Sequence, residues 1–369
     1  MKAISIVPHV VGISLVDRQE PRISAPDEVK LRVLQIGICG TDREEVNGGR
    51  ADAPPGKKEL VIGHEMFGRV VETGSGVTAV KPGDYGAFTV RRGCGQCKAC
   101  LNNRSDMCYT GRYTERGIKG ADGYQTPYVV DKEQYLVKIP GKIKDIGVLT
   151  EPMSVAAKAI DEALIIQQAR ISDFDQDKNW LAGKRVMVAG LGPIGLLAAF
   201  ALRLRGAHVL GLDVVDEATL RPQLLKEIGG SYIDGRKLKP TDIDTTCGEM
   251  DFIFEATGVA KLQVQLIDAL APNGIYVITG IPEAGRSITV MGGDIMQQLV
   301  LKNQVVLGSV NASLRHFSQA VAYLEQSMQQ WPQAISRVIT TRVPHTEFET
   351  ALKNHSPNEI KAVVQWADE

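Results

Sequence analysis

Four of the six cysteines in this chain lie in one short stretch, residues 94–108. Their spacing is C-x2-C-x2-C-x7-C, contributed by Cys94, Cys97, Cys100 and Cys108. Four thiolates at such intervals can close a tetrahedron around Zn²⁺ and leave no coordination position for water or substrate. The stretch therefore predicts a structural zinc site in a lobe of about residues 91–110. The alternatives are a disulfide pair and a rubredoxin-like iron site, although the iron pattern usually consists of two separated C-x2-C pairs.

The bulk properties of the chain indicate two domains and a reducing compartment. Its 369 residues exceed what one core ordinarily accommodates. The formal net charge of −1 gives no reason to expect nucleic acid or an anionic membrane as a partner. Because the first residues lack the regions of a signal peptide and no apolar run is long enough to cross a bilayer, we expect a cytoplasmic protein. In that compartment clustered cysteines more often bind metal than form disulfides.

Two regions with different hydrophobic periodicity correspond to the two domains. Up to about residue 150 the chain consists of short runs broken by Gly and Pro, which predict a barrel-like β domain with strands such as 29–34, 68–74 and 80–84. The character changes near 150, and from 184 onward strands alternate with helices, which predicts a parallel sheet covered by helices and an α/β class. The expected strands are 184–190, 209–212, 252–256, 276–279 and 305–308. The expected helices are 152–168, 194–204, 220–228, 262–270, 295–300 and 316–329.

A glycine-rich turn after the strand at 184–190 predicts a dinucleotide site. The G-x-G-x-x-G pattern consists of Gly190, Leu191, Gly192, Pro193, Ile194 and Gly195. Its glycines allow a tight turn, close approach of a pyrophosphate and close packing of helix on strand, and the helix N-terminus offers N–H groups to phosphate. Asp213 ends the next strand, where a carboxylate binds the ribose hydroxyls and repels the extra phosphate of NADP. Val214 and Val215 follow, where an NADP site tends to offer Arg, so the sequence favours NAD over NADP.

Three separated pieces of the β domain carry side chains that can bind a metal. They contain Cys39, His64 beside Glu65, and Glu151. One thiolate, one imidazole and one carboxylate would leave a fourth position open, as a catalytic zinc requires. Sequence spacing alone does not bring these residues together. Taken singly, each has an ordinary explanation: a core cysteine, a hydrogen-bonded structural histidine and a glutamate that begins a helix.

Taken together, the motifs resemble those of the zinc-dependent medium-chain dehydrogenases along essentially the whole chain. The matching segments occur in family order: 37–42, 63–65, 81–84, the cysteine lobe, the Gly190 turn and 255–258. Within that family, segments 39–44, 91–95, 136–140, 145–147 and 308–317 are similar to the archaeal-type glucose 1-dehydrogenases. The resemblance implies a GroES-like β-barrel catalytic domain, residues 1–155 and 311–369, and a doubly wound Rossmann domain, residues 156–310, as a two-domain α+β arrangement.

The resemblance also implies which residues form the metal and cofactor sites. The catalytic zinc would be held by Cys39, His64 and Glu151, with Glu65 entering its shell when water or substrate exchanges. With the zinc of the cysteine lobe, two zinc ions per chain are expected. In the cofactor site, Thr257 and Asn311 would join the glycine-rich turn and Asp213.

The implied reaction is hydride transfer from a substrate hydroxyl to the nicotinamide, with zinc lowering the pKa of that hydroxyl. Thr41, two residues after Cys39, is placed to pass the proton outward. Glu44 would continue the relay, because related alcohol dehydrogenases have His at the corresponding place. An exposed acidic helix face is the alternative explanation for Glu44.

The resemblance points to an aldose, oxidised at C1, as substrate. The residues that match the sugar-binding set of the glucose dehydrogenases are Thr41, Glu115, Glu151 and Asn311. Two positions depart from that set: Val90 replaces Asn, and Val155 replaces Asp. Each sugar hydroxyl left unpaired in a dry pocket costs about 1–3 kcal/mol. Another polyol or a secondary alcohol is therefore the alternative substrate.

Two other classes of function fit the sequence less well. A zinc module that binds nucleic acid or protein would be expected to have a basic face with stacking aromatics, and it would leave the dinucleotide site unexplained. A nucleotide-binding relative without catalysis would be expected to lose the open zinc ligands, which this chain keeps. The family resemblance favours a homotetramer or homodimer built partly on the sheet edge of the nucleotide domain.

Overall fold

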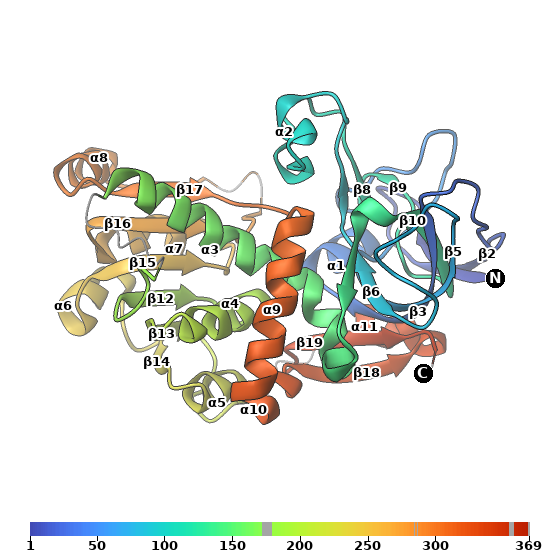
Figure 1. Cartoon of the computed structure of the whole chain (residues 1–369). Helices are drawn as coiled ribbons and strands as arrows, with labels where there is room; N and C mark the ends of the chain where they lie inside the picture. Colours follow the sequence, from blue (N-terminus) through green and yellow to red (C-terminus); the bar gives the residue numbers. More distant parts are fainter. Residues whose placement is uncertain (172–178, 284, 286, 354–357, 368–369) are drawn as a thin grey trace. The chain divides into compact units, whose positions relative to one another are not determined.

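A computed structural model of the chain describes residues 1–171, 179–283, 285, 287–353 and 358–367. They form two units (Figure 1): the first comprises Met1–Ser154, Asn311–Met328 and Ser336–Glu369, and the second comprises Val155–Val310 and Gln329–Ile335. The expected extent of the catalytic domain, 311–369, thus differs at 329–335, because Trp331 packs edge-on against Phe200 at 5.9 Å between ring centroids. No described helix is long and apolar enough to cross a membrane.

The first unit is built on a seven-stranded sheet in the order β11-β6-β5-β3-β19-β18, with β10 paired to β3. Its strands are β3 (Glu28–Ile38), β5 (Glu65–Thr73), β6 (Tyr85–Phe88), β10 (Tyr128–Lys132), β11 (Leu136–Ile139), β18 (Ile339–Pro344) and β19 (Lys361–Gln365). The C-terminal strand β19 pairs antiparallel with β3, and β3 pairs with β5, so residues far apart in sequence share neighbouring strands. The predicted strand at 80–84 is wrong: this segment is a turn, with Gly83 at φ +96.

Two smaller sheets and seven helices complete the described part of the first unit. One sheet has the order β2-β1-β4 and the other β7-β8-β9. Their strands are β1 (Lys2–Ile6), β2 (Ser14–Asp17), β4 (Leu60–Val61), β7 (Arg91–Arg92), β8 (Thr114–Arg116) and β9 (Gly120–Ala121). The α-helices are α1 (Gly40–Val46), α2 (Lys98–Leu101) and α11 (Phe348–Lys353), and the 3-10 helices are η1 (Ser105–Met107), η2 (Glu133–Tyr135), η3 (Gly141–Leu149) and η6 (His345–Glu347). Three further helices, α3 (Thr150–Arg170), α9 (Leu314–Gln330) and α10 (Pro332–Ser336), run through unit boundaries.

The second unit is a six-stranded parallel sheet in the order β14-β13-β12-β15-β16-β17. Counted along the chain from β12, this is the 3-2-1-4-5-6 order of doubly wound dinucleotide-binding folds. The strands are β12 (Arg185–Ala189), β13 (His208–Asp213), β14 (Ser231–Asp234), β15 (Met250–Glu255), β16 (Leu270–Ile278) and β17 (Val305–Gly308). The helices are α4 (Pro193–Leu204), α5 (Leu220–Glu227), α6 (Ile243–Cys247), α7 (Ala260–Gln265) and α8 (Gly292–Leu301).

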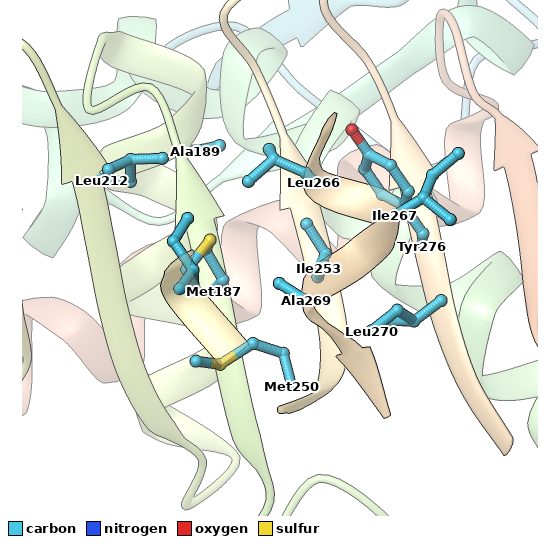
Figure 2. Close-up of a cluster of buried hydrophobic side chains, with 11 residues drawn as sticks. Met187, Ala189, Leu212, Met250, Ile253, Leu266, Ile267, Ala269, Leu270 and Tyr276 are labelled. Atoms are coloured by element: carbon cyan, nitrogen blue, oxygen red, sulfur yellow. The ribbon is translucent and has the colours of Figure 1, made fainter. Parts of the chain in front are cut away.

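Alternate residues of β12 show how helices cover both faces of this sheet. Met187 and Ala189 belong to a buried cluster with residues of β13, β15, β16 and the 3-10 helix η5 (Leu266–Ala269) (Figure 2). Val188, of opposite parity, lies against Gly195 of α4. The predicted helix at 262–270 corresponds to α7, which ends at Gln265, and the 3-10 helix η5 that follows it, and only its last residue, Leu270, belongs to β16.

Candidate active site

The four cysteines of the lobe come together between β7 and β8. Their Sγ atoms all lie within 4.8 Å of one another, and all four are free thiols. The Cys97 and Cys100 sulfurs are 3.5 Å apart, well beyond a disulfide bond, so the disulfide alternative is not what the lobe forms. Hydrogen bonds from the Thr110 hydroxyl and from backbone N–H groups lower the pKa of Cys94 to about 5, which favours the thiolate that a metal needs. The geometry and charge of this group fit a closed zinc site.

A second metal-capable group joins the end of β3, the start of β5 and the N-terminus of α1. The ligand atoms of Cys39, His64 and Glu65 lie within 4.8 Å of one another, and Cys39 Sγ is 3.1 Å from His64 Nε2. Cys39 is the N-cap of α1: its sulfur accepts from the Thr41 N–H, while its own N–H donates to Asp42 Oδ2 at 2.8 Å. This reciprocal capping fixes the direction of the thiol.

Strand register explains why Glu65 points into this group. Gly37 of β3 lies opposite Glu65, and a Cβ at Gly37 would stand 2.0 Å from Glu65 Oε2. The carboxylate accepts two hydrogen bonds of 2.7 Å from Lys361 Nζ, which also donates to the Ile38 carbonyl at 3.0 Å. Lys361 is 1% exposed and Glu65 2% exposed. Burial lowers the pKa of Lys361, but the charge and hydrogen bonds of Glu65, together with the charges of Cys39 and Glu151, raise that pKa overall.

Glu151 at the start of α3 is buried but lies outside the group of three. Burial, together with the charge of Glu65, raises its pKa to about 7. The structure thus brings Glu65 closer to Cys39 and His64 than Glu151, whereas the sequence predicts Glu151 as the ligand and Glu65 as the neighbour. Cys39, Glu65 and Glu151 add more potential negative charge to this buried region than Lys361 balances. A bound dication would relieve that excess, so the donor set fits Zn²⁺.

Glu45 is a further buried carboxyl beside this group that the sequence analysis missed. It is 0% exposed and both its oxygens lack a hydrogen-bond partner, as does Asp42 Oδ1, which lies 3.6 Å from His64 Nδ1. Burial, and then the charge of Asp42, raises the pKa of Glu45 to about 9. Asp42, Glu45 and Val46 are the buried residues of α1 and follow helical spacing, but two of the three are acidic, so no apolar periodicity in the sequence marks this face.

We expect Glu45 to make the protein less stable as the pH rises. Between its usual pKa of 4.5 and about 9, the folded protein keeps a proton that the unfolded chain releases. Its stabilising contribution is therefore complete below pH 4.5 and is lost as the pH rises through 9, by at most about 1.4 kcal/mol per pH unit. Glu45→Gln should remove this slope in urea unfolding at pH 5, 7 and 9. Glu44→Gln, at an exposed neighbour, is the control; equal slopes in wild type and Glu45→Gln would contradict the expectation.

The remaining site residues predicted in the first unit form two sets: Glu115 and Asn311 lie together, and Thr41 and Glu44 lie on α1. Glu115 of β8 accepts hydrogen bonds from Arg91 and from Asn311, whose Nδ2 lies 2.6 Å from Glu115 Oε1. Thr41 lies in the first turn of α1, half-buried. Glu44 is exposed, with Arg50 Nε 3.4 Å from its carboxylate. Its placement matches the exposed acidic face that was the alternative to a proton relay.

The glycine-rich turn of the second unit has the geometry of a dinucleotide site. Gly190 has φ +87, and a Cβ at Gly195 would stand 1.8 Å from the Gly190 carbonyl oxygen. A Cβ at Gly192 would meet nothing within 4 Å, so this position faces open space where a phosphate could approach. Asp213 ends β13 and accepts from the Leu191 N–H at 2.8 Å. Thr257 follows β15 and donates from its N–H to Glu255 at 2.6 Å.

Two known protein families match nearly all of the chain. Residues 25–141 match the alcohol dehydrogenase GroES-like domain, and residues 144–366 match the glucose dehydrogenase C-terminus. The chain belongs to the glucose dehydrogenase family. This family consists of zinc-dependent medium-chain oxidoreductases, so the predicted fold class, a GroES-like domain with a Rossmann domain, is confirmed, and the chain is an enzyme of the glucose and alcohol dehydrogenase type.

Individual members of the glucose dehydrogenase family align along the full chain. Glucose 1-dehydrogenase 2 of Vulcanisaeta moutnovskia is 36% identical over 366 residues, covering 99% of each chain. Glucose 1-dehydrogenase of Thermoproteus tenax is also 36% identical and covers 99% of each chain. The structure of Haloferax mediterranei glucose dehydrogenase with NADP, Zn and gluconolactone has a TM-score of 0.89 at 31% identity and covers 100% of both chains. The presence of NADP there does not support the predicted preference for NAD over NADP.

Proposed function

We propose that this enzyme oxidises an aldose at C1 and transfers the hydride to a nicotinamide dinucleotide. The observation that supports this most strongly is that one unit contains both the metal-capable group of Cys39, His64 and Glu65 and the hydrogen-bonded pair Glu115 and Asn311. Zinc bound by the metal-capable group would act as a Lewis acid on the reacting hydroxyl. Glu115 and Asn311 offer an acceptor and a donor to other sugar hydroxyls. Gluconolactone, the C1 oxidation product of glucose, is bound by the Haloferax relative, which supports an aldose substrate.

A screen of aldoses, polyols and simple alcohols tests this proposal. We expect NADH or NADPH absorbance to rise with D-glucose, D-galactose or D-xylose, and kcat/KM to be at least about tenfold lower with sorbitol or a secondary alcohol, because a ligand that leaves a polar group unpaired loses about 1–3 kcal/mol. Metal analysis should give two zinc ions per chain. An enzyme that oxidises a polyol or alcohol better than every aldose would refute the proposal.

A second candidate substrate, a less hydroxylated polyol or secondary alcohol, has its own support. Val90, beside Arg91 at the start of β7, is 2% exposed and offers no side-chain partner to a sugar hydroxyl. The 2R,3R-butanediol dehydrogenase of Bacillus subtilis, at 26% identity and a TM-score of 0.78 over 99% of both chains, shows that a related chain acts on such a molecule. The same screen separates the two candidates.

We further propose that NAD is preferred to NADP, although the Haloferax relative holds NADP. The support is local: Asp213 ends β13 with its carboxylate anchored by the Leu191 and Val214 N–H groups, where it would repel a 2′-phosphate. Arg221 Nη1, 3.7 Å from Asp213 Oδ2, partly offsets that charge. We expect kcat/KM to be higher with NAD, and Asp213→Gly to shift the ratio toward NADP by about tenfold or more. A wild-type ratio in favour of NADP would overturn the preference.

Self-association through the nucleotide unit is also proposed, as a homodimer or homotetramer. Strand β17 is the edge of the parallel sheet, and the neighbouring helix α8 exposes apolar side chains: Met296 is 60%, Val300 75% and Leu301 73% exposed. Exposed apolar groups beside an unpaired strand edge favour pairing with a second copy. Sedimentation equilibrium that returned only monomer would refute this. Cytoplasmic localisation remains a prediction of the sequence.

A further inference from the structure

The carboxylate of Glu115 has one engaged oxygen and one open oxygen. Oε1 accepts three hydrogen bonds: 3.0 Å from Arg91 Nε, 2.9 Å from Arg91 Nη2 and 2.6 Å from Asn311 Nδ2. None of the described residues donates to Oε2. A carboxylate oxygen accepts more than one hydrogen bond, so Oε2 is left for a ligand hydroxyl. The direction of Oε2 is therefore set by the groups that bind Oε1.

Arg91 holds Oε1 and is itself anchored in the cysteine lobe. Its Nη1 donates to the Asp106 carbonyl at 2.7 Å, and its guanidinium lies 4.0 Å from the centroid of the Tyr113 ring. Asp106 lies in η1, two residues before Cys108, and its side chain is fully buried and paired with Arg104. The Arg91 side chain is 8% exposed. One guanidinium therefore ties the lobe to Glu115.

The register of β7 and β8 reinforces this link. Arg91 pairs directly with Glu115 across the two strands, and the lobe is the excursion of chain between them. With few strand residues to hold it, the lobe depends on its cysteines for a fixed shape. A metal that joins the four thiolates would fix Asp106 and Tyr113 together, and so fix the guanidinium that they hold.

We propose that Arg91 is a positioning residue through which the metal of the cysteine lobe sets the affinity of the enzyme for its sugar. The proposal rests on the proposed function, which makes Glu115 a sugar-binding residue. The lobe metal does no chemistry in this scheme. It keeps the guanidinium fork in place, and the fork keeps Oε2 of Glu115 directed at the ligand.

Arg91→Lys tests the first link, with Arg92→Lys as matched control. A lysine keeps the charge but cannot reproduce the fork, the carbonyl bond and the ring stack together. Arg92 is the next residue of β7 and also has an acidic partner and an aromatic partner, with Asp131 at 2.8 Å and the Tyr135 ring at 4.0 Å, but its described contacts include none of Glu115, Asp106 and Tyr113. We expect Arg91→Lys to raise KM for D-glucose about tenfold or more while kcat and the KM for the cofactor change less than about twofold, as for a lost uniform binding interaction. Arg92→Lys should lower the melting temperature and leave the sugar KM unchanged.

The second link is tested by weakening the lobe metal. Titration calorimetry with D-glucose and no cofactor gives a binding constant independent of turnover, and zinc content is measured on the same samples. Cys100→Ser, or Cys94→Asp if the former does not fold, should weaken glucose binding about tenfold in the wild-type background. In the Arg91→Lys background it should cause little further loss, because both changes act through one contact.

Two results would overturn the inference: wild-type glucose affinity in Arg91→Lys, or fully additive losses in the double variant. Failure of the proposed function looks different, because the wild-type enzyme would then neither bind nor oxidise any aldose. If the wild-type enzyme binds glucose, the affinities of the Arg91→Lys variants either support or refute the positioning role of Arg91.

Discussion

Cys39→Ser is expected to remove one of the two zinc ions that we propose for each chain and to lower kcat/KM by about 1,000-fold or more. Cys39 supplies the only sulfur in the group of Cys39, His64 and Glu65, and its Sγ lies 3.1 Å from His64 Nε2. A Lewis acid at the reacting hydroxyl supplies several kcal/mol of transition-state stabilisation, and each 1.36 kcal/mol is tenfold in rate. A serine hydroxyl is a poor zinc ligand at neutral pH, because it does not ionise as a thiol does.

Measurement of metal content beside turnover makes this result specific. Zinc should fall from two to one per chain while the circular dichroism of the variant stays that of the wild type. Cys247→Ser is the control, since Cys247 is a half-buried thiol of the nucleotide unit outside every described metal-capable group. A Cys39→Ser enzyme with two zinc ions and full turnover would show that the open group is not the catalytic centre.

Lys361→Met is expected to lower the free energy of unfolding by about 3–5 kcal/mol. The substitution removes the ammonium that donates to both oxygens of Glu65 and leaves a buried carboxylate without its cation. Removing one partner of a buried ion pair is strongly destabilising, whereas replacing both partners with neutral groups is often tolerated. The double variant Glu65→Gln with Lys361→Met should therefore recover much of the loss. Urea unfolding of the metal-depleted protein isolates this effect from any compensation by zinc.

An exposed ion pair supplies the control for this prediction. Lys353 and Glu349 pair on α11 with side chains 53% and 55% exposed, and Lys353→Met should change stability by less than about 0.5 kcal/mol. If Lys361→Met and Lys353→Met had the same small effect, the buried pair would not have the energetic weight that its burial indicates.

Lys361 and Glu45 are buried ionisable residues whose surroundings cannot be read from the sequence pattern. Lys361 is one charge in an otherwise apolar run, 360–364, and such a break in a strand signals a buried partner without saying which. The partner, Glu65, is 296 residues away and is reached only because β19 lies beside β3 and β3 beside β5. Two adjacent glutamates, Glu44 and Glu45, are typical of a solvated helix face, so the sequence pattern does not predict the burial of Glu45. The helix instead buries Glu45 and exposes Glu44.

The sequence by itself determined the class of this protein. Local patterns sufficed to predict that the four lobe cysteines come together, because they lie close in sequence, and to predict the glycine-rich turn, whose strand–turn–helix setting is local too. The tertiary structure decided the rest: that Glu65 lies closer than Glu151 to Cys39 and His64, that Lys361 neutralises Glu65, and that Arg91 joins the lobe to Glu115. These contacts depend on sheet register and burial, which bring distant residues into one low-dielectric region, and no spacing along the chain encodes them.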